Sequence, residues 1–237
     1  MLAVFVNMAT VLIGSAIGIL FRNRIKESYV RTIICALALV TFVIGISSAI
    51  QTQDILCVIV CMAFGTIIGE LLRLDERING AGDYLKRKLL RGKGEENRFT
   101  EGFVSACILF CVGSMTIMGS LEAGVNHNYS IIFAKSALDF VSSMMFGAAM
   151  GIGVPFAALF ILVFQGGLTL LAGLVSPYLS QAVITEMTAV GGTVLIGMGF
   201  NMLELSDKRI MVASMLPAIF LPIAYVPLSA WISGLIG

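Results

Sequence analysis

The chain has 237 residues, of which 58% are hydrophobic and only 12% charged, and its mean hydropathy is +0.99. A soluble domain needs more surface charge than this, whereas lipid tails solvate apolar side chains, so the composition excludes a soluble protein and predicts a membrane protein. The net charge of +1 argues against a nucleic-acid partner, which would require a basic face. We therefore expect a single transmembrane domain over residues 1–237, with the lipid bilayer as its surroundings.

Eight apolar segments reach spanning length, since one span takes about 20 residues. This predicts an all-α, polytopic transmembrane bundle. Gly113 and Ser114 should soften the fourth segment, and Pro217 and Pro222 should bend the eighth. The segments are 2–21, 32–50, 55–72, 103–121, 131–150, 155–175, 185–205 and 210–232.

The basic residues predict the orientation. Twelve of the fifteen Lys and Arg residues lie in 22–31 and 73–98, which follow the first and third segments. Short basic loops stay on the cytoplasmic side, so the N-terminus should lie outside. Consistently, the predicted external loops 51–54, 122–130 and 176–184 contain no Lys or Arg.

The polar stretch 73–102 is expected to be a cytoplasmic basic loop or a pair of interfacial helices. Leu74, Ile78, Leu85 and Leu89 recur at helical spacing, and the basic residues among them suit anionic headgroups. The stretch would then anchor the topology. The alternative is a docking site for a cytosolic partner.

Lys135 and Asp139 are the ionisable pair expected deepest in the bilayer. They lie four residues apart, so they share one face of the fifth segment. An ionisable group at this depth is costly and invites a functional interpretation. Asp139 would bind a cation or proton, with Lys135 as its counter-charge or as a contact for a substrate anion. The alternative is a neutralised pair that only holds helices together.

Gln165, Gly166 and Gly167 fall near the middle of the sixth segment. Two consecutive glycines weaken a helix by about 1 kcal/mol each relative to alanine. Transporters bind ions and substrates where such a helix is unwound, so these three residues are candidates for a binding site. Close helix packing explains the glycines equally well.

The seventh segment repeats this pattern with Gly191 and Gly192, and adds Asn201 in its inner half. Asn201 would contact a ligand or make an interhelical hydrogen bond. Glu186, near the outer end, would be an entry residue or simply a hydrated carboxylate. The motif at 41–45 resembles 193–197 in an oppositely directed segment, as in inverted repeats. Inverted repeats and discontinuous helices are therefore one architecture that the sequence suggests.

Catalytic motifs are missing from the sequence. It has no P-loop, no dinucleotide-binding glycine motif after a strand, and no HExxH pair. The cysteines lie in apolar segments without histidine partners, which favours packing over a metal site. We therefore expect neither an enzyme nor a cofactor.

Several short stretches resemble, in their order and spacing, those of a known protein family. They are Val6-Asn7, 13–18, 109–115, 135–139, 151–154, 164–166 and the run from Glu186 to Asn201. In these the chain resembles the YqgA/YdfK-like family of bacterial inner-membrane proteins, whose function is unknown. The resemblance implies a bacterial plasma-membrane protein with seven or eight helices.

Two functions follow as hypotheses. The first is a small secondary transporter or channel-like carrier of a small solute or monovalent ion, driven by an H⁺ or Na⁺ gradient with Asp139 as the coupling group. The second is a non-transporting sensor or assembly partner that acts through the basic loop. Small-residue faces suit tight helix contacts, and a homodimer is one assembly they would permit.

Overall fold

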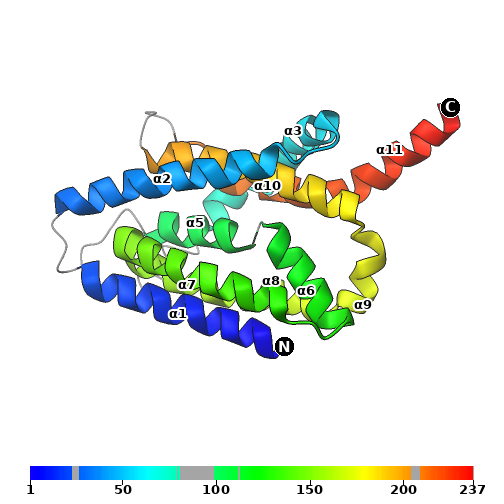
Figure 1. The fold of residues 1–237 in the computed structure, drawn as a ribbon. Helices are drawn as coiled ribbons and strands as arrows, with labels where there is room; N and C mark the ends of the chain where they lie inside the picture. The colour runs from blue at the N-terminus through cyan, green and yellow to red at the C-terminus, as the bar shows by residue number, and fades with distance from the viewer. Residues whose placement is uncertain (23–26, 79, 81–98, 112, 204–208, 237) are drawn as a thin grey trace.

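In a computed structural model of the chain, residues 1–22, 27–78, 80, 99–111, 113–203 and 209–236 are described. Within these ranges the regular structure is helical and contains no strand (Figure 1). The all-α fold predicted from composition is confirmed. The α-helices are α1 (Leu2–Arg22), α2 (Glu27–Ala49), α3 (Ile55–Leu71), α5 (Phe99–Cys111), α6 (Ser114–Val125), α7 (Ser130–Met150), α8 (Ala157–Leu170), α9 (Ala172–Val175), α10 (Gln181–Met202) and α11 (Pro222–Ile236), and the 3₁₀ helices are η1 (Gly151–Phe156), η2 (Ser176–Tyr178) and η3 (Val212–Phe220).

Side-chain caps fix where two of these helices begin. Asp54 accepts a hydrogen bond from Leu56 N at 3.0 Å before α3, and Ser180 accepts one from Val183 N at 3.3 Å before α10. Each cap satisfies one of the backbone donors that a helix leaves free at its N-terminus. The seventh predicted segment therefore begins at Gln181, four residues earlier than expected.

Four helical stretches are long and apolar enough to cross a membrane, or six if each of two bent pairs forms one span. The predicted number of eight spans is not confirmed. α3 is apolar but only 17 residues long. One bent pair is α5 with α6, at 57°, and the other is η3 with α11, at 45°. The second bend lies at Pro222, which confirms the bend predicted there.

α1 and α7 run parallel and in close contact. A β-carbon on Gly14 would clash with Ser143, and one on Gly18 would clash with the backbone at Ala148. Because the residue numbers rise together along both helices, the two chains point the same way. This close approach requires glycine, as small-residue spacing predicts for membrane helices.

The continuous helical stretch Ser130–Leu170 doubles back at η1. Gly151, at the start of η1, takes a φ of 80°, a left-handed conformation that suits glycine. After the turn α8 returns along α1, so that Gly166 lies beside Val4 near the start of α1. α8 is therefore antiparallel to both α1 and α7.

α2 and α10 form the second close pair, and they are antiparallel. A β-carbon on Gly192 would lie 2.6 Å from Gly45 O and 2.6 Å from Ala49 N, while Phe42 packs edge-on against Phe200. The relative directions of these helix pairs are those that alternating spans require. The proposed inverted repeat remains a prediction.

Two groups of helices result, as Figure 1 shows. α1, α7 and α8 lie on one side of the bundle, α2, α10 and η3 lie on the other, and α5 and α6 run between them. α11 projects beyond the rest of the bundle. Most of the predicted basic loop, at 79 and 81–98, lies outside the described residues.

Candidate functional site

The ion pair on α7 is buried in the bundle. Lys135 Nζ donates to Asp139 Oδ2, and the two residues are only 5% and 7% exposed. Their spacing of four residues places both side chains on the face of α7 that packs against α1 and α5. The pair is therefore sheltered by protein rather than by lipid, as the sequence predicts for charges at this depth.

Two amide side chains extend this pair into a polar centre that joins three helices. Asn7 on α1 donates from Nδ2 to Gln165 Oε1 on α8 at 3.0 Å, and both side chains are fully buried. The Asn7 amide also lies beside the Asp139 carboxylate. We call Asn7, Lys135, Asp139 and Gln165 the polar centre.

The polar centre is incompletely satisfied. Asn7 Oδ1 and Gln165 Nε2 are buried atoms without a hydrogen-bond partner. Leaving such a group unpaired costs about 1–3 kcal/mol. One acceptor and one donor therefore remain available in the same place, which is the arrangement expected where a small polar ligand or ion binds.

The C-terminal end of α5 borders the polar centre. Lys135 Nζ lies 5.9 Å from the centre of the Phe110 ring, and Cys111 lies near both Lys135 and Asp139. After Cys111 the helix is interrupted before α6 begins, and Thr116 Oγ1 donates to Phe110 O at 2.9 Å. A side chain thus replaces the backbone donor that a continuous helix would have supplied to this carbonyl.

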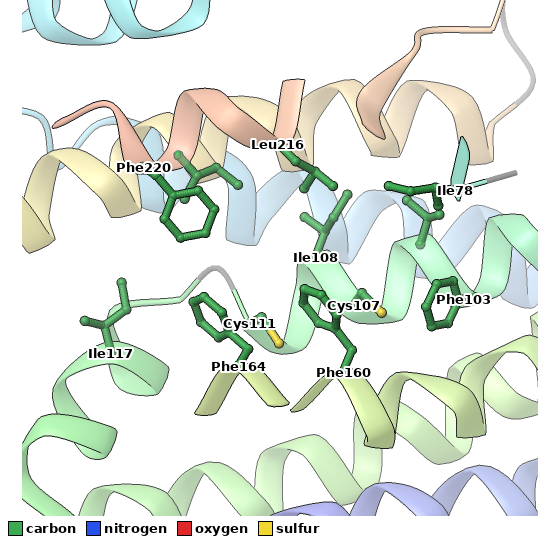
Figure 2. Close-up of a pocket in the computed structure, with 12 residues that line it drawn as sticks. Ile78, Phe103, Cys107, Ile108, Cys111, Ile117, Phe160, Phe164, Leu216 and Phe220 are labelled. Atoms are coloured by element: carbon green, nitrogen blue, oxygen red, sulfur yellow. The ribbon is translucent and has the colours of Figure 1, made fainter. Parts of the chain in front are cut away.

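An apolar cavity of about 280 Å³ lies against α5. Figure 2 shows Phe160 and Phe164 of α8 facing Leu216 and Phe220 of η3 across it. Cys111 lines this cavity and also lies near the ion pair, so the cavity and the polar centre adjoin at the C-terminal end of α5. The sequence did not predict the cavity, because its lining comes from helices far apart in the chain.

Of the two alternatives for the double glycines, unwinding and close packing, unwinding is wrong. α8 is a continuous α-helix through Gly166 and Gly167, and α10 is continuous through Gly191 and Gly192. Unpaired backbone groups in a bilayer cost several kcal/mol each, more than the roughly 1 kcal/mol of helix propensity that a glycine loses. Gly192 instead permits the close approach to α2.

Glu186 and Asn201 lie outside the polar centre and have structural partners. Glu186, expected to be an entry residue or a hydrated carboxylate, is buried, at 3% exposed. It accepts hydrogen bonds from Thr52 Oγ1, Gln53 N and Asp54 N at 2.6, 2.7 and 3.2 Å. It thereby ties α10 to the turn before α3.

Asn201 pairs with the backbone of Ile210 through two hydrogen bonds of 2.8 Å. These bonds close the connection between α10 and η3. The expected ligand contact at Asn201 therefore has no support in its surroundings, and the residue bonds to backbone rather than to another helix's side chain.

The structure thus brings together Lys135, Asp139 and Gln165, and adds Asn7, which the sequence did not rank among the binding residues. The sequence does mark Asn7 as a candidate, because it is the one amide in the apolar run 2–21. A single amide in a helix is ambiguous until its neighbours are known.

Comparisons with known proteins agree with the resemblance inferred from short motifs. The family DUF554, described as a protein of unknown function, matches residues 2–227. The chain is 28% identical over 220 residues to the uncharacterized membrane protein YdfK of Bacillus subtilis (strain 168), covering 91% of each chain. It is 29% identical over 228 residues to the uncharacterized protein YqgA of Escherichia coli (strain K12), covering 95% of each. No solved structure matches the chain.

Proposed function

The chain belongs to the DUF554 family of proteins of unknown function, so its activity must be argued from its own residues, and we propose that it is a secondary transporter or channel-like carrier. Its cargo would be a small solute or monovalent ion, driven by an H⁺ or Na⁺ gradient. The observation that carries this proposal is the buried polar centre, in which Asn7 Oδ1 and Gln165 Nε2 lack partners. A centre that served packing alone would be better satisfied.

Asp139 is the proposed coupling group. Its carboxylate is the counter-charge of Lys135, and no other acidic side chain of the described residues contacts that ammonium. An ion that neutralised Asp139 would leave the Lys135 charge uncompensated in a low-dielectric interior. Such a change is large enough to shift the balance between two conformations, because an unpaired buried charge costs several kcal/mol.

The discontinuity between α5 and α6 supports moving parts beside this centre. Broken helices adjoin the binding sites of many secondary transporters. The neighbouring cavity is apolar, so its lining offers water few hydrogen-bond partners. In our proposal the structure represents an occluded state, in which the polar centre is closed to water on this side.

We further propose that the protein resides in the bacterial plasma membrane with its N-terminus outside and its basic loops cytoplasmic. The support is the Lys and Arg distribution, together with the directions of the contacting pairs, α1 with α7 and α2 with α10. The partners would be the lipid bilayer and the cargo. A homodimer through small-residue faces is part of the same proposal.

Uptake by proteoliposomes tests the transport function. The purified protein would be given a panel of small solutes under an imposed H⁺ or Na⁺ gradient, with mass spectrometry of the lumen as the readout. Asp139→Asn should abolish gradient-driven uptake while folding normally, whereas Glu122→Gln, whose carboxylate bonds only the exposed Asn126, should transport at the wild-type rate. Full-rate uptake by a well-folded Asp139→Asn protein would refute the mechanism.

A further inference from the structure

Resting on the proposed carrier function, we infer that the coupling ion bound at the polar centre is a proton on the Asp139 carboxylate, and not Na⁺ or another metal cation. Three features of the described residues carry this inference. They are the position of Lys135, the lack of free backbone oxygens, and the unpaired acceptor of Asn7.

Lys135 already holds the place that a metal cation would take. Its ammonium donates directly to Asp139 Oδ2, and both residues project from the same rigid helix, one turn apart. A metal ion at this carboxylate would sit against a positive charge that cannot withdraw without breaking the pair. A proton adds to a carboxylate oxygen and needs no such space.

Backbone oxygens are not available to replace the hydration shell of a metal ion. Na⁺ sites in transporters use the carbonyls of unwound helices. Here α1, α7 and α8 run without interruption past the residues of the polar centre, so their carbonyls are engaged in helical hydrogen bonds. At the nearest break, the Phe110 carbonyl is occupied by Thr116.

The nearby hydroxyl groups are also engaged. Ser136 donates to Ile132 O at 2.7 Å, and Ser143 donates to Phe140 O at 3.0 Å, both within α7. Among the buried side-chain oxygens of the described residues, Asn7 Oδ1 is the one without a partner. One free oxygen beside a carboxylate is too few for a metal ion.

A protonated Asp139 suits that single free oxygen. An ionised carboxylate only accepts hydrogen bonds, whereas a carboxylic acid has an O–H donor. Asn7 lies beside the Asp139 carboxylate, and its Oδ1 is a buried acceptor without a donor. When the proton binds, Lys135 keeps its own charge, and the net charge of the pair rises from zero to +1.

No other acid competes for this role at the polar centre. On the elements packed against α7, the described charged or titratable groups lie toward helix ends or are thiols, and the one nearest the pair is Cys111. α8 and η1 carry no such group. The groups are Arg22 on α1, Tyr29, Arg31 and Cys35 on α2, Glu101, Cys107 and Cys111 on α5, and Glu122 on α6.

Infrared difference spectroscopy of the full chain in lipid tests this inference without knowledge of the cargo. The pH would be lowered in K⁺ buffer, and the C=O stretch of newly protonated carboxyl groups recorded. We expect a band that is lost entirely in Asp139→Asn and retained in Glu122→Gln. Should Asp139→Asn fail to fold, Asp139→Glu keeps a carboxyl group at this position but shifts the frequency of its C=O band. That shift would likewise assign the band to residue 139.

Sodium is then the decisive probe. Replacing K⁺ with Na⁺ should leave the pH midpoint of the Asp139 band unchanged. If Na⁺ competed, the midpoint would fall by about one pH unit for each tenfold rise in its concentration above its dissociation constant. That shift, or the absence of any Asp139 band while the protein stays folded, would overturn the inference. If Na⁺ competed and uptake still depended on Asp139, the proton assignment would fail while the carrier function would stand. If the Asp139 band were insensitive to Na⁺ and no uptake occurred, the carrier function alone would be refuted.

Discussion

The amide of Asn7 on α1 donates to Gln165 on α8 at 3.0 Å, and each side chain keeps one buried polar atom unused. The two residues are 158 positions apart in the sequence and come from antiparallel helices. Their hydrogen bond connects the start of the chain to the ion pair on α7. It makes the polar centre a joint property of three helices.

A double-mutant cycle should detect this bond. Asn7→Leu and Gln165→Leu each leave the other amide buried with fewer partners, so each should lower the free energy of unfolding by about 1 kcal/mol. The double variant removes both amides and should lose less than the sum, with a coupling energy of about 0.5–1.5 kcal/mol. Unfolding in mixed micelles provides the measurement. Strict additivity would mean that the two side chains act independently.

Two glycines in similar sequence settings should respond oppositely to alanine. Gly192→Ala places a β-carbon 2.6 Å from backbone atoms of α2, so it should cost about 1–3 kcal/mol of stability through overpacking. Gly167→Ala meets nothing within 4 Å and should stabilise α8 by up to about 1 kcal/mol. Thermal unfolding of the two purified variants would compare them. Equal effects would contradict the close α2–α10 contact.

Removing the Glu186 carboxylate should loosen the junction between α10 and the turn before α3. Glu186→Ala deletes the acceptor of three hydrogen bonds, and bonds to a charged group contribute about 1.5–3 kcal/mol each in favourable cases. Because Thr52 and the backbone donors are only partly buried, we expect a total loss of about 2–3 kcal/mol. Hydrogen exchange at Gln53 and Asp54 should rise in parallel.

Glu122→Ala is the matched control for this loss. Its carboxylate accepts one exposed hydrogen bond from Asn126 at 3.1 Å, so its removal should change stability by less than about 0.5 kcal/mol. Similar losses in the two variants would mean that burial of Glu186 has no energetic consequence.

Filling the apolar cavity should stabilise the protein. Cys107 lines the cavity, and Cys107→Leu adds carbon atoms to empty space, with a gain of about 0.8 kcal/mol for each methylene group buried without strain. Val190→Leu adds volume at a fully packed position of α10 and should instead cost about 1–3 kcal/mol. The pair would be compared by thermal unfolding in detergent. A loss in Cys107→Leu would show that the cavity wall cannot accept a larger side chain.

Much of the site could be predicted because polar groups are conspicuous in an apolar sequence. Lys135, Asp139 and Gln165 were identified by their depth in predicted spans, and the structure places them in one polar centre. Helical periodicity was sufficient for the i,i+4 pair. It could not reveal Asn7 as the link, since the pairing of α1 with α8 depends on tertiary packing.

The expected unwinding of α8 and that of α10 were both wrong for the same physical reason. Gly166, Gly167, Gly191 and Gly192 lower helix propensity, and propensity alone favours unwinding at these positions. In the structure, backbone hydrogen bonding in an apolar environment outweighs that preference. The interruption falls instead between α5 and α6, where Thr116 can satisfy the carbonyl that the break exposes.

The cavity between α8 and η3 has a mechanical consequence. Glycine contacts pack α1 closely against α7 and α2 closely against α10, whereas the cavity leaves empty volume between Phe160 and Leu216. Hydrostatic pressure favours the state with less empty volume. Pressure should therefore move α8 and η3 toward each other and reduce the volume of the cavity. A motion of the two helix groups that changes this volume would then respond to pressure.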